Sequence, residues 1–170
     1  YSLTGGTDLA AYTLTSNPLY KDAMSAKTVY VAAVNANYET AFGQATVTIT
    51  KRTVDLTSGS ASQTYNGEAL SSPNVTIGGD NFAPMEGFAT PPHSSVSITN
   101  AGSVTNVFDI PALFGGTNEA NYTFVKHEGT LTVNKAVLTA TADDKSMTYG
   151  DTAAPAGSVT YTGFVPGETT

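Results

Sequence analysis

The sequence predicts an all-β fold, built from antiparallel β-sandwich modules of about 84 residues in series. Three observations lead to it. The chain of 170 residues is 40% hydrophobic but only 12% charged, and its polar character comes mainly from Thr, Ser, Asn and Gly. Thr favours strands, whereas Ser, Asn and Gly favour turns. Short stretches of alternating apolar and polar residues recur, and several landmarks repeat at one offset.

An offset of 84 positions links three separated pairs of landmarks. Asn37-Tyr38 matches Asn121-Tyr122, Lys51 matches Lys135, and Thr64-Tyr65 matches Thr148-Tyr149. A repeat of this length is typical of tandem modules, each a small folded unit beside its neighbour. Repetition in series extends a molecule and does not by itself build an active site, so we expect a structural or adhesive role.

The clearest predicted strands occur twice. Thr46–Thr50 and its counterpart Thr130–Asn134 alternate with period two, which predicts that four residues face a core: Val47, Ile49, Leu131 and Val133. Each strand runs almost directly into another, at Thr53–Thr57 and at Ala136–Ala140. These junctions predict the back part of one module (residues 1–51), a complete module (52–135) and the front part of another (136–170). Neither junction holds Gly or Pro, so we expect both to be stiff.

Inside the complete module, further strands are separated by turn signals. The strand candidates are Asn74–Ile77, Ser95–Thr99, Val104–Ile110 and Tyr122–Val125. The turn signals are Tyr65–Gly67, Gly78–Asn81, Gly115–Asn118 and Pro91-Pro92. No segment holds a helical period for three turns, and Asp8–Tyr12 comes nearest.

The offset changes along the chain, and each change indicates a loop. Asp22–Ser25 matches Asn100–Ser103 at an offset of 78, and the offset returns to 84 at Asn121. A six-residue insertion is therefore expected around Ala112–Gly116, in a surface loop. Near the other end, Phe164-Val165-Pro166 resembles Phe82-Ala83-Pro84 at an offset of 82.

Charge and cysteine content exclude several classes of protein. The net charge of −7 and the scattering of only seven Lys and Arg residues argue against a nucleic-acid partner. The chain has no Cys, which excludes disulfides and thiolate metal sites. No apolar run approaches the roughly 20 residues that span a bilayer, and no signal peptide is visible. We expect an extracellular bacterial protein whose signal and anchor lie outside these residues.

Candidate chemical groups are few. His93 and His127 are the only histidines, and no nucleophile motif accompanies them, so we expect no enzymatic activity. Two acidic groups leave calcium as an alternative to solvated turns: Asp143, Asp144, Asp151 and Glu168 in one, and Asp80, Asn81 and Glu86 in the other. We expect no catalytic, cofactor or metal residues. Lys–Asn cross-links are another alternative, which requires a buried Lys beside an Asn or Asp and an acid.

Aromatic residues provide the remaining candidates. Phe82 and Phe88 flank a loop rich in Gly and Pro, where exposed rings could form a sugar-binding platform. Tyr38 and Tyr122 precede a core strand, where a tyrosine packs its ring and hydrogen-bonds its hydroxyl. Core or interface packing is the favoured interpretation for all four residues.

Four short stretches carry a family resemblance. Ala45–Lys51 and Gly129–Lys135 look like a closing strand and junction, Thr139–Asp151 like an opening segment with a Tyr-Gly turn, and Lys21–Val31 like a middle strand. Together they resemble the bacterial surface repeats called MBG domains ("mostly beta, glycine-rich") and the wider bacterial Ig-like group. Met24 stands where such repeats usually place Gly. The resemblance implies secreted, often wall-anchored, stalk-forming proteins, and it brings no catalytic residues.

The combined interpretation is a series of Ig-like antiparallel sandwich modules, with β-grasp-like modules as the alternative. The predicted function is that of a stalk or fibre shaft for adhesion. Its expected partners are neighbouring modules or copies of the chain, together with host or cell-surface glycan or protein that other regions would contact. Two alternatives stay open. One is an extracellular filament assembled head to tail by complementation of the partial modules. The other is a glycan- or protein-binding module that uses Phe82, Phe88 or the loop at Ala112–Gly116.

Overall fold

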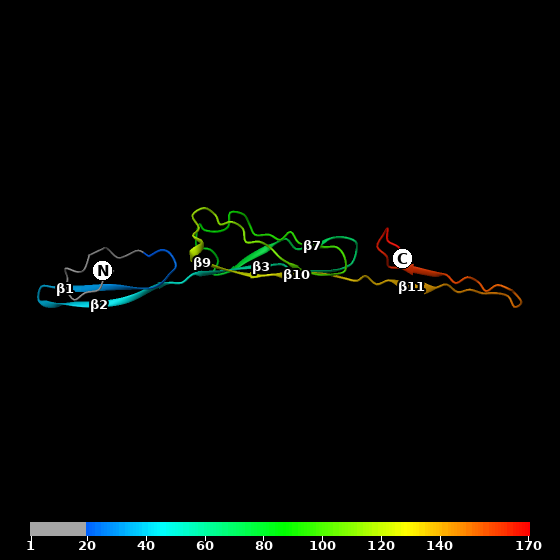
Figure 1. The fold of residues 1–170 in the computed structure, drawn as a ribbon, viewed down its shortest axis with the longest axis horizontal. Helices are drawn as coiled ribbons and strands as arrows, with labels where there is room; N and C mark the ends of the chain where they lie inside the picture. Colours follow the sequence, from blue (N-terminus) through cyan, green and yellow to red (C-terminus); the bar gives the residue numbers. More distant parts are fainter. Residues whose placement is uncertain (1–19) are drawn as a thin grey trace. The chain divides into compact units, whose positions relative to one another are not determined.

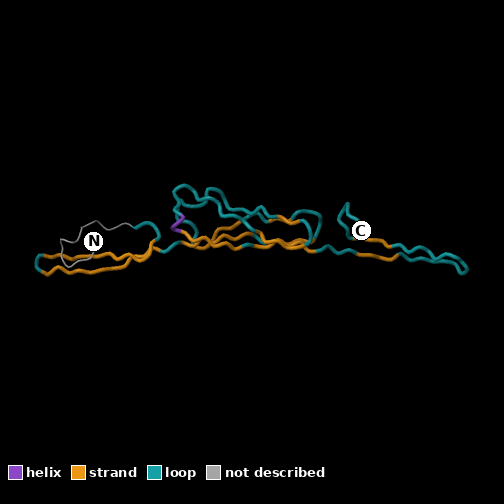
Figure 2. The backbone as a smooth tube through the Cα atoms, in the orientation of Figure 1, coloured by secondary structure: helices purple, strands orange, loops and turns teal. Residues whose placement is uncertain are grey.

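The computed structural model describes residues 20–170, whose regular secondary structure is almost entirely β strand, joined by long loops and turns (Figures 1 and 2). In chain order the strands are β1 (Met24–Asn35), β2 (Tyr38–Ile49), β3 (Arg52–Ser58), β4 (Ala61–Thr64), β5 (Leu70–Ser71), β6 (Val75–Gly79), β7 (Ser97–Ile98), β8 (Gly102–Asn106), β9 (Tyr122–His127), β10 (Gly129–Asn134), β11 (Thr139–Ala142) and β12 (Val159–Thr162). One turn of 3-10 helix, η2 (Glu119–Asn121), precedes β9. No α-helix occurs within residues 20–170, so the all-β prediction is confirmed. The weak helical candidate Asp8–Tyr12 lies outside the described residues.

Contacts divide the described chain into two compact units. Unit 1 takes the described residues up to Leu56, with Ile77–Pro91 and Pro111–Lys126. Unit 2 takes Thr57–Thr76, Pro92–Ile110 and His127–Thr170. The repeat boundaries at 51/52 and 135/136 stay a prediction, because they rest on sequence offsets rather than on contacts. The first 19 residues of the predicted segment 1–51 lie outside the described part.

In unit 1, β1 and β2 form an antiparallel hairpin. The two-residue turn between them is held by the backbone N–H of Asn37, which donates to Asn35 Oδ1 at 2.9 Å. Val29, opposite Ala45, is the one buried residue of the hairpin. Val47 and Ile49 are half-buried, so the predicted core face is present but only partly covered. In β3 of the same unit, Val54 and Leu56 are fully buried, as the alternation of that strand requires.

In unit 2, β10 is the centre of a three-stranded sheet ordered β4-β10-β8. It pairs antiparallel with β8, where Leu131 lies opposite Val104, and parallel with β4, where Val133 lies opposite Gln63. Leu131 and Val133 are buried, which confirms their predicted core placement. The parallel ladder differs from the purely antiparallel expectation, because the polar segment Ala61–Thr64 gave no strand signal in the sequence.

The other sheets are small. Strands β6, β3 and β9 form a sheet in the order β6-β3-β9, β5 pairs with β7, and β11 pairs antiparallel with β12 from Thr139↔Thr162 to Ala142↔Val159. The predicted strands at Asn74–Ile77 and Tyr122–Val125 are observed as β6 and β9. Two others are shorter than expected: Ser95–Thr99 shrinks to β7, and Val104–Ile110 ends at Asn106.

A buried amide organises the core of unit 2. Asn106 has no exposed surface, and its Nδ2 donates to the carbonyls of Gly59 at 2.9 Å and Ser72 at 2.8 Å. Its Oδ1 accepts from Ser94 Oγ at 2.6 Å, and its own carbonyl accepts from Ser58 Oγ at 2.6 Å. Buried polar groups are tolerated when their hydrogen bonds are made, and this side chain makes three. Strand β8 therefore ends at a buried, hydrogen-bonded amide rather than at an apolar side chain.

Candidate functional site

The aromatic side chains of unit 1 pack against one another. The ring centroids of Phe82 and Phe88 lie 4.9 Å apart in an edge-on arrangement, and Phe82 lies 5.0 Å from Tyr122. Phe124 completes the cluster, 5.7 Å from Phe88 and stacked on Tyr122. Phe82, Phe88 and Phe124 are half-buried and Tyr122 is 4% exposed. The packing interpretation of Phe82 and Phe88 is confirmed, because rings engaged edge to face in this way do not form a flat exposed platform.

The two tyrosines that were expected to pack behave differently. The hydroxyl of Tyr122 donates to the Glu86 carboxylate and accepts the backbone N–H of Ala83 at 3.0 Å. Burial, followed by the bond to Glu86, raises the pKa of Tyr122 above its usual range. Tyr38 is 77% exposed, so its predicted packing is wrong. It opens β2 directly after the turn, opposite Asn35, where no described strand covers it.

The predicted insertion lies on the surface and is pinned by backbone bonds. The N–H of Ala89 donates to Ala112 O, and the N–H of Phe114 donates to Gly87 O, both at 2.8 Å. Between these bonds, Phe88 and Leu113 form an isolated bridge. Phe114 is 55% exposed, so the loop offers one large apolar side chain to solvent. The predicted surface position of the insertion is confirmed.

One turn occurs in both units with the same backbone geometry. In Ala83–Glu86 the N–H of Glu86 donates to Ala83 O at 3.1 Å, and in Val165–Glu168 the N–H of Glu168 donates to Val165 O at 3.0 Å. Each turn has Pro at its second position and a positive φ at its third, 67° at Met85 and 93° at Gly167. This combination is typical of a type II turn, which favours Gly at the third position.

Replacing Met85 with Gly should stabilise the chain by about 0.5–1 kcal/mol. A non-Gly residue in the left-handed region costs about 1–2 kcal/mol of strain, which Gly relieves. Gly also loses more conformational entropy on folding than other residues, and this loss offsets about half of the relieved strain. The side chain of Met85 is 95% exposed, so its removal deletes little packing. Urea denaturation measures the change. The control is Gly167→Met at the matching position, which should destabilise, and a loss of stability in Met85→Gly would contradict the strain argument.

Each unit contains a cavity beside this turn. The cavity of unit 1 has a volume of about 530 Å³, and its lining includes Lys51, Arg52, Asp80 and Glu86. The cavity of unit 2 has a volume of about 320 Å³, and its lining includes Tyr65, Lys135, Leu138, Phe164 and Glu168. Lys51 and Lys135 are matched by the offset of 84, and Glu86 and Glu168 by the offset of 82. The two cavities therefore occupy the same place in the predicted repeat.

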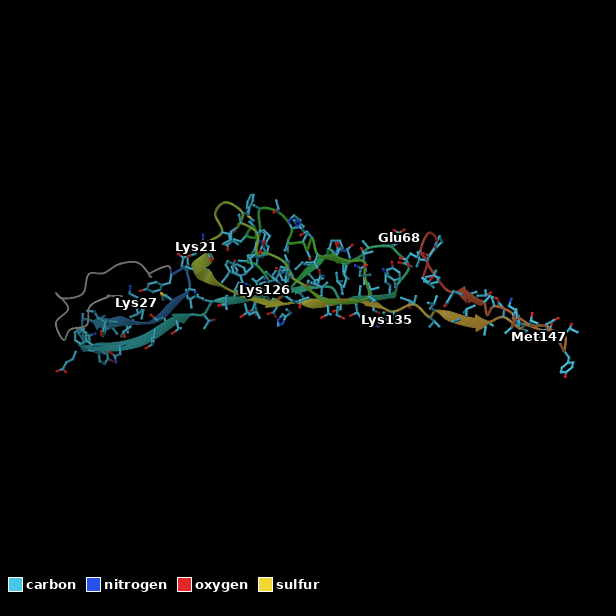
Figure 3. The ribbon with its side chains drawn as sticks, turned by 45° about the vertical axis from the view of Figure 1, so that its right-hand side comes forward. Lys21, Lys27, Glu68, Lys126, Lys135 and Met147 are labelled. Atoms are coloured by element: carbon cyan, nitrogen blue, oxygen red, sulfur yellow. The ribbon has the colours of Figure 1, made fainter. Side chains whose placement is uncertain are left out.

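A tyrosine lines the smaller cavity. The hydroxyl of Tyr65 donates to Glu168 Oε1, and this bond raises the pKa of Tyr65. Lys135, labelled in Figure 3, follows the end of β10 and lines the same cavity. In the larger cavity of unit 1, Arg52 Nε instead donates to Asn81 O at 2.9 Å, while Arg52 Nη2 donates to Asp80 O. Sequence reasoning missed the Tyr65–Glu168 pair, since 103 positions separate the two residues.

Sequence reasoning also missed a group of hydrogen bonds in unit 1 that joins Asp22 and Ala23 to Asn118 and Asn121. Asn121 Oδ1 accepts the N–H of Ala23 at 2.7 Å, and Asn121 Nδ2 donates to Asp22 Oδ1 at 2.9 Å. Asn118 Nδ2 also reaches Asp22, at 3.3 Å, and both bonds, that of Asn121 first, lower the pKa of the Asp22 carboxyl. The repeated Asn-Tyr pair singled out Asn121 in the sequence, but no sequence pattern indicated that it bonds to Asp22 and Ala23.

The acidic groups do not converge. Asp143 accepts from Ser158 Oγ at 2.6 Å and Thr160 Oγ1 at 2.9 Å, bonds that lower its pKa, and Asp151 accepts the N–H of Thr148 at 2.9 Å. Asp80 accepts the N–H of Thr53 at 2.9 Å. Within residues 20–170, no three His, Asp or Glu side chains lie close enough to hold a metal ion, so the geometry gives the calcium alternative no support.

The remaining candidates are on the surface. His93 bridges to Asn74 through the backbone, and both His93 and His127 are exposed. All six lysines are exposed as well, which removes the buried environment that the cross-link alternative requires. The expectation that the chain is not an enzyme stays a prediction.

Comparison with known proteins identifies one part of the chain. Residues 138–170 match the family model of the MBG domain (YGX type). The match includes Tyr149-Gly150, the turn on which part of the sequence resemblance rested, and it confirms that resemblance for this segment. MBG domains occur in bacterial surface proteins. No curated protein and no solved structure matches the chain. In the part that the structure describes, no helix is both long and apolar enough to cross a membrane.

Proposed function

We propose, starting from the MBG domain match of residues 138–170, that the chain is a structural repeat region of a bacterial extracellular surface protein and acts as a stalk. In this role the modules follow one another in series and carry load between an anchor and a distal region. The proposal assigns no enzymatic activity, cofactor or metal to the chain. Its immediate partners are the neighbouring modules.

The observation that carries the proposal is the parallel pairing of β4 with β10. Ala61 lies opposite Leu131 and Thr64 opposite Asn134, so the start of β4 and the end of β10 lie at opposite ends of the pair. These two strands belong to the beginning and the end of the predicted complete module. Tension applied through them in opposite directions shears the ladder, so its hydrogen bonds share the load instead of breaking one after another. A module with this geometry suits a load-bearing series.

Recurring local structure supports the serial arrangement. The turn at Ala83–Glu86 recurs at Val165–Glu168, and the cavity beside it recurs as well. The pairing of Met24 with Ile49 has the same place in the repeat as the pairing of Gly102 with Val133. Between Met24 and Lys27 a bulge then shifts the register of β1 and β2 by one residue. Similar units in series are what a stalk requires.

Single-molecule pulling tests the proposal, with handles on both ends of the chain. The N–H of Tyr65 donates to Asn134 O at 2.8 Å, so by alternation the N–H of Gln63 also faces β10 and that of Thr64 faces away. Gln63→Pro removes a rung of the ladder and should lower both the peak unfolding force and the stability, the latter by about 1–3 kcal/mol. The control Thr64→Pro removes an N–H that does not face β10, so it should keep a higher peak force.

The outcome decides between a load-bearing and a passive chain. We expect the unchanged chain to show a distinct unfolding peak that Gln63→Pro reduces and Thr64→Pro largely preserves. Equal forces for all three proteins would show that the β4–β10 ladder does not bear load, and the stalk proposal would then lose its main support.

A further inference from the structure

Unit 2 contains an Asn-Gly turn directly after β4. Asn66 and Gly67 are exposed, and they form the one Asn-Gly pair in the sequence. Gly67 has a positive φ of 82°, which Gly adopts without strain. An Asn side chain deamidates when the backbone nitrogen of the next residue attacks its amide carbon. Gly has no Cβ beside that nitrogen, so an Asn-Gly pair offers the least hindered attack.

The hydrogen bonds of Asn66 favour this reaction. The N–H of Glu68, labelled in Figure 3, donates to Asn66 Oδ1 at 3.0 Å, and Gln63 Nε2 donates to the same oxygen at 3.4 Å. Donors at this oxygen stabilise the negative charge that develops on it when a nucleophile attacks the amide carbon. Within residues 20–170 the N–H of Gly67 has no acceptor. The turn therefore places a polarised amide carbon next to a backbone nitrogen that is free to attack it.

We propose that Asn66 deamidates spontaneously in the folded chain and that the product loosens the contact of its turn with residues 165–168. The nitrogen of Gly67 loses its proton to water and forms a bond to Asn66 Cγ. The bond from Cγ to Nδ2 breaks, and ammonia leaves with a proton. One water molecule then opens the five-membered imide. Opening at Cγ gives Asp, and opening at the main-chain carbonyl gives isoaspartate, so the reaction needs no reagent other than water.

Two other Asn residues share the hydrogen bond but lack the glycine. In Asn35 and Asn118, Oδ1 also accepts the backbone N–H of the residue two positions later, at 2.9 Å and 3.1 Å, and both side chains are exposed. The next residue is Ala in the first case and Glu in the second, so a Cβ crowds the attacking nitrogen. We expect both to deamidate at least about tenfold more slowly than Asn66, which corresponds to a barrier about 1.4 kcal/mol higher.

The product acts on a close contact within unit 2. A Cβ placed on Gly67 would lie 3.0 Å from Val165 Cγ1, so there is little room between the two segments. Isoaspartate lengthens the main chain by one carbon and displaces Gly67 within this contact. Either product also adds one negative charge to the net charge of −7. Beside the turn, the hydroxyl of Tyr65 donates to Glu168 Oε1, and we expect this bond to weaken. A stalk needs no such modification, so the inference goes beyond the proposed function.

Peptide mapping by mass spectrometry tests the site in the full chain. The protein is incubated over a series of pH values from neutral to alkaline. The peptide with Asn66 should gain the mass that replaces an amide by a carboxyl group, and the rate should rise with pH, because the nitrogen attacks after it loses its proton. The peptides with Asn35 and Asn118 are controls in the same sample. An unmodified Asn66, or equal rates at all three positions, would overturn the proposal.

Asn66→Gln tests the consequence for unit 2. Gln keeps an amide, but its cyclisation requires a larger ring, so this variant should stay unmodified. Because position 66 is exposed, the fresh variant should unfold close to the urea concentration of the fresh unchanged chain. After incubation the unchanged chain should unfold at a lower urea concentration, and Asn66→Gln should not shift. A chain that carries isoaspartate and unfolds as before would refute the loosened contact. The pulling experiment uses fresh protein, so its outcome is independent of this one.

Discussion

Asn106→Leu should lower the free energy of unfolding by at least about 3 kcal/mol, the largest loss that we expect from a single substitution. The change removes both Nδ2 donors and the Oδ1 acceptor from a site with no exposed surface. The carbonyls of Gly59 and Ser72 then lose this donor, and the hydroxyl of Ser94 keeps only the carbonyl of Val107 as acceptor. Each buried polar group that loses its hydrogen bond costs about 1–3 kcal/mol, because water does not replace it. Urea denaturation followed by circular dichroism measures the difference.

Asn134→Leu is the matched control for this substitution. Asn134 is an exposed Asn at the end of β10, and it contributes to the sheet through its backbone. A surface change of this kind stays within about 0.5 kcal/mol of the unchanged chain. If Asn106→Leu and Asn134→Leu unfold at the same urea concentration, the buried amide is not the anchor of unit 2.

For Asn106, the sequence predicts a position on the buried face of a strand but not the groups to which the side chain bonds. The strand Val104–Ile110 was predicted from its apolar residues, and its period of two places Asn106 on the same face as Val104 and Phe108. That alternation was the signal for a buried amide. The four groups that Asn106 satisfies come from residues 12 to 48 positions away, and no local pattern specifies them.

The same limit applies to the strands. Thr46–Thr50, Thr53–Thr57 and Thr130–Asn134 were predicted because apolar and polar residues alternate there and because the offset of 84 doubles the evidence. Strand β4 was missed, since Ala61–Thr64 holds no large apolar residue and exists as a strand only through its ladder with β10. Tyr38 was misplaced for a related reason. The landmark that it shares with Tyr122 predicted equal environments, but burial depends on neighbouring strands, and only Tyr122 has the cluster around Phe82 beside it.

The cavities were also beyond local reasoning. The repeat in the sequence singled out some of the lining residues separately, namely the matched Lys51 and Lys135 and the repeated Phe-x-Pro segment. What brings them together is the meeting of a strand end with that turn, which a one-dimensional pattern does not encode. The offset nevertheless shows that the two cavities correspond in the repeat.

Val133→Ala should destabilise the chain by about 2–4 kcal/mol, and Ile49→Ala should cost clearly less. The two residues match at the offset of 84 and occupy corresponding strands, but Val133 is 2% exposed between β4 and β8 whereas Ile49 is half-buried. Removing apolar atoms from a closed site loses their transfer free energy and leaves a cavity, while a half-covered site loses only part of the first term.

This pair of variants also measures how far the core of the hairpin is covered. Chemical denaturation with urea gives the free energy of unfolding of each variant and of the unchanged chain. The matching positions make the comparison direct, because both residues lie in corresponding strands and differ in burial. Equal costs for the two substitutions would contradict the partly covered core of the hairpin.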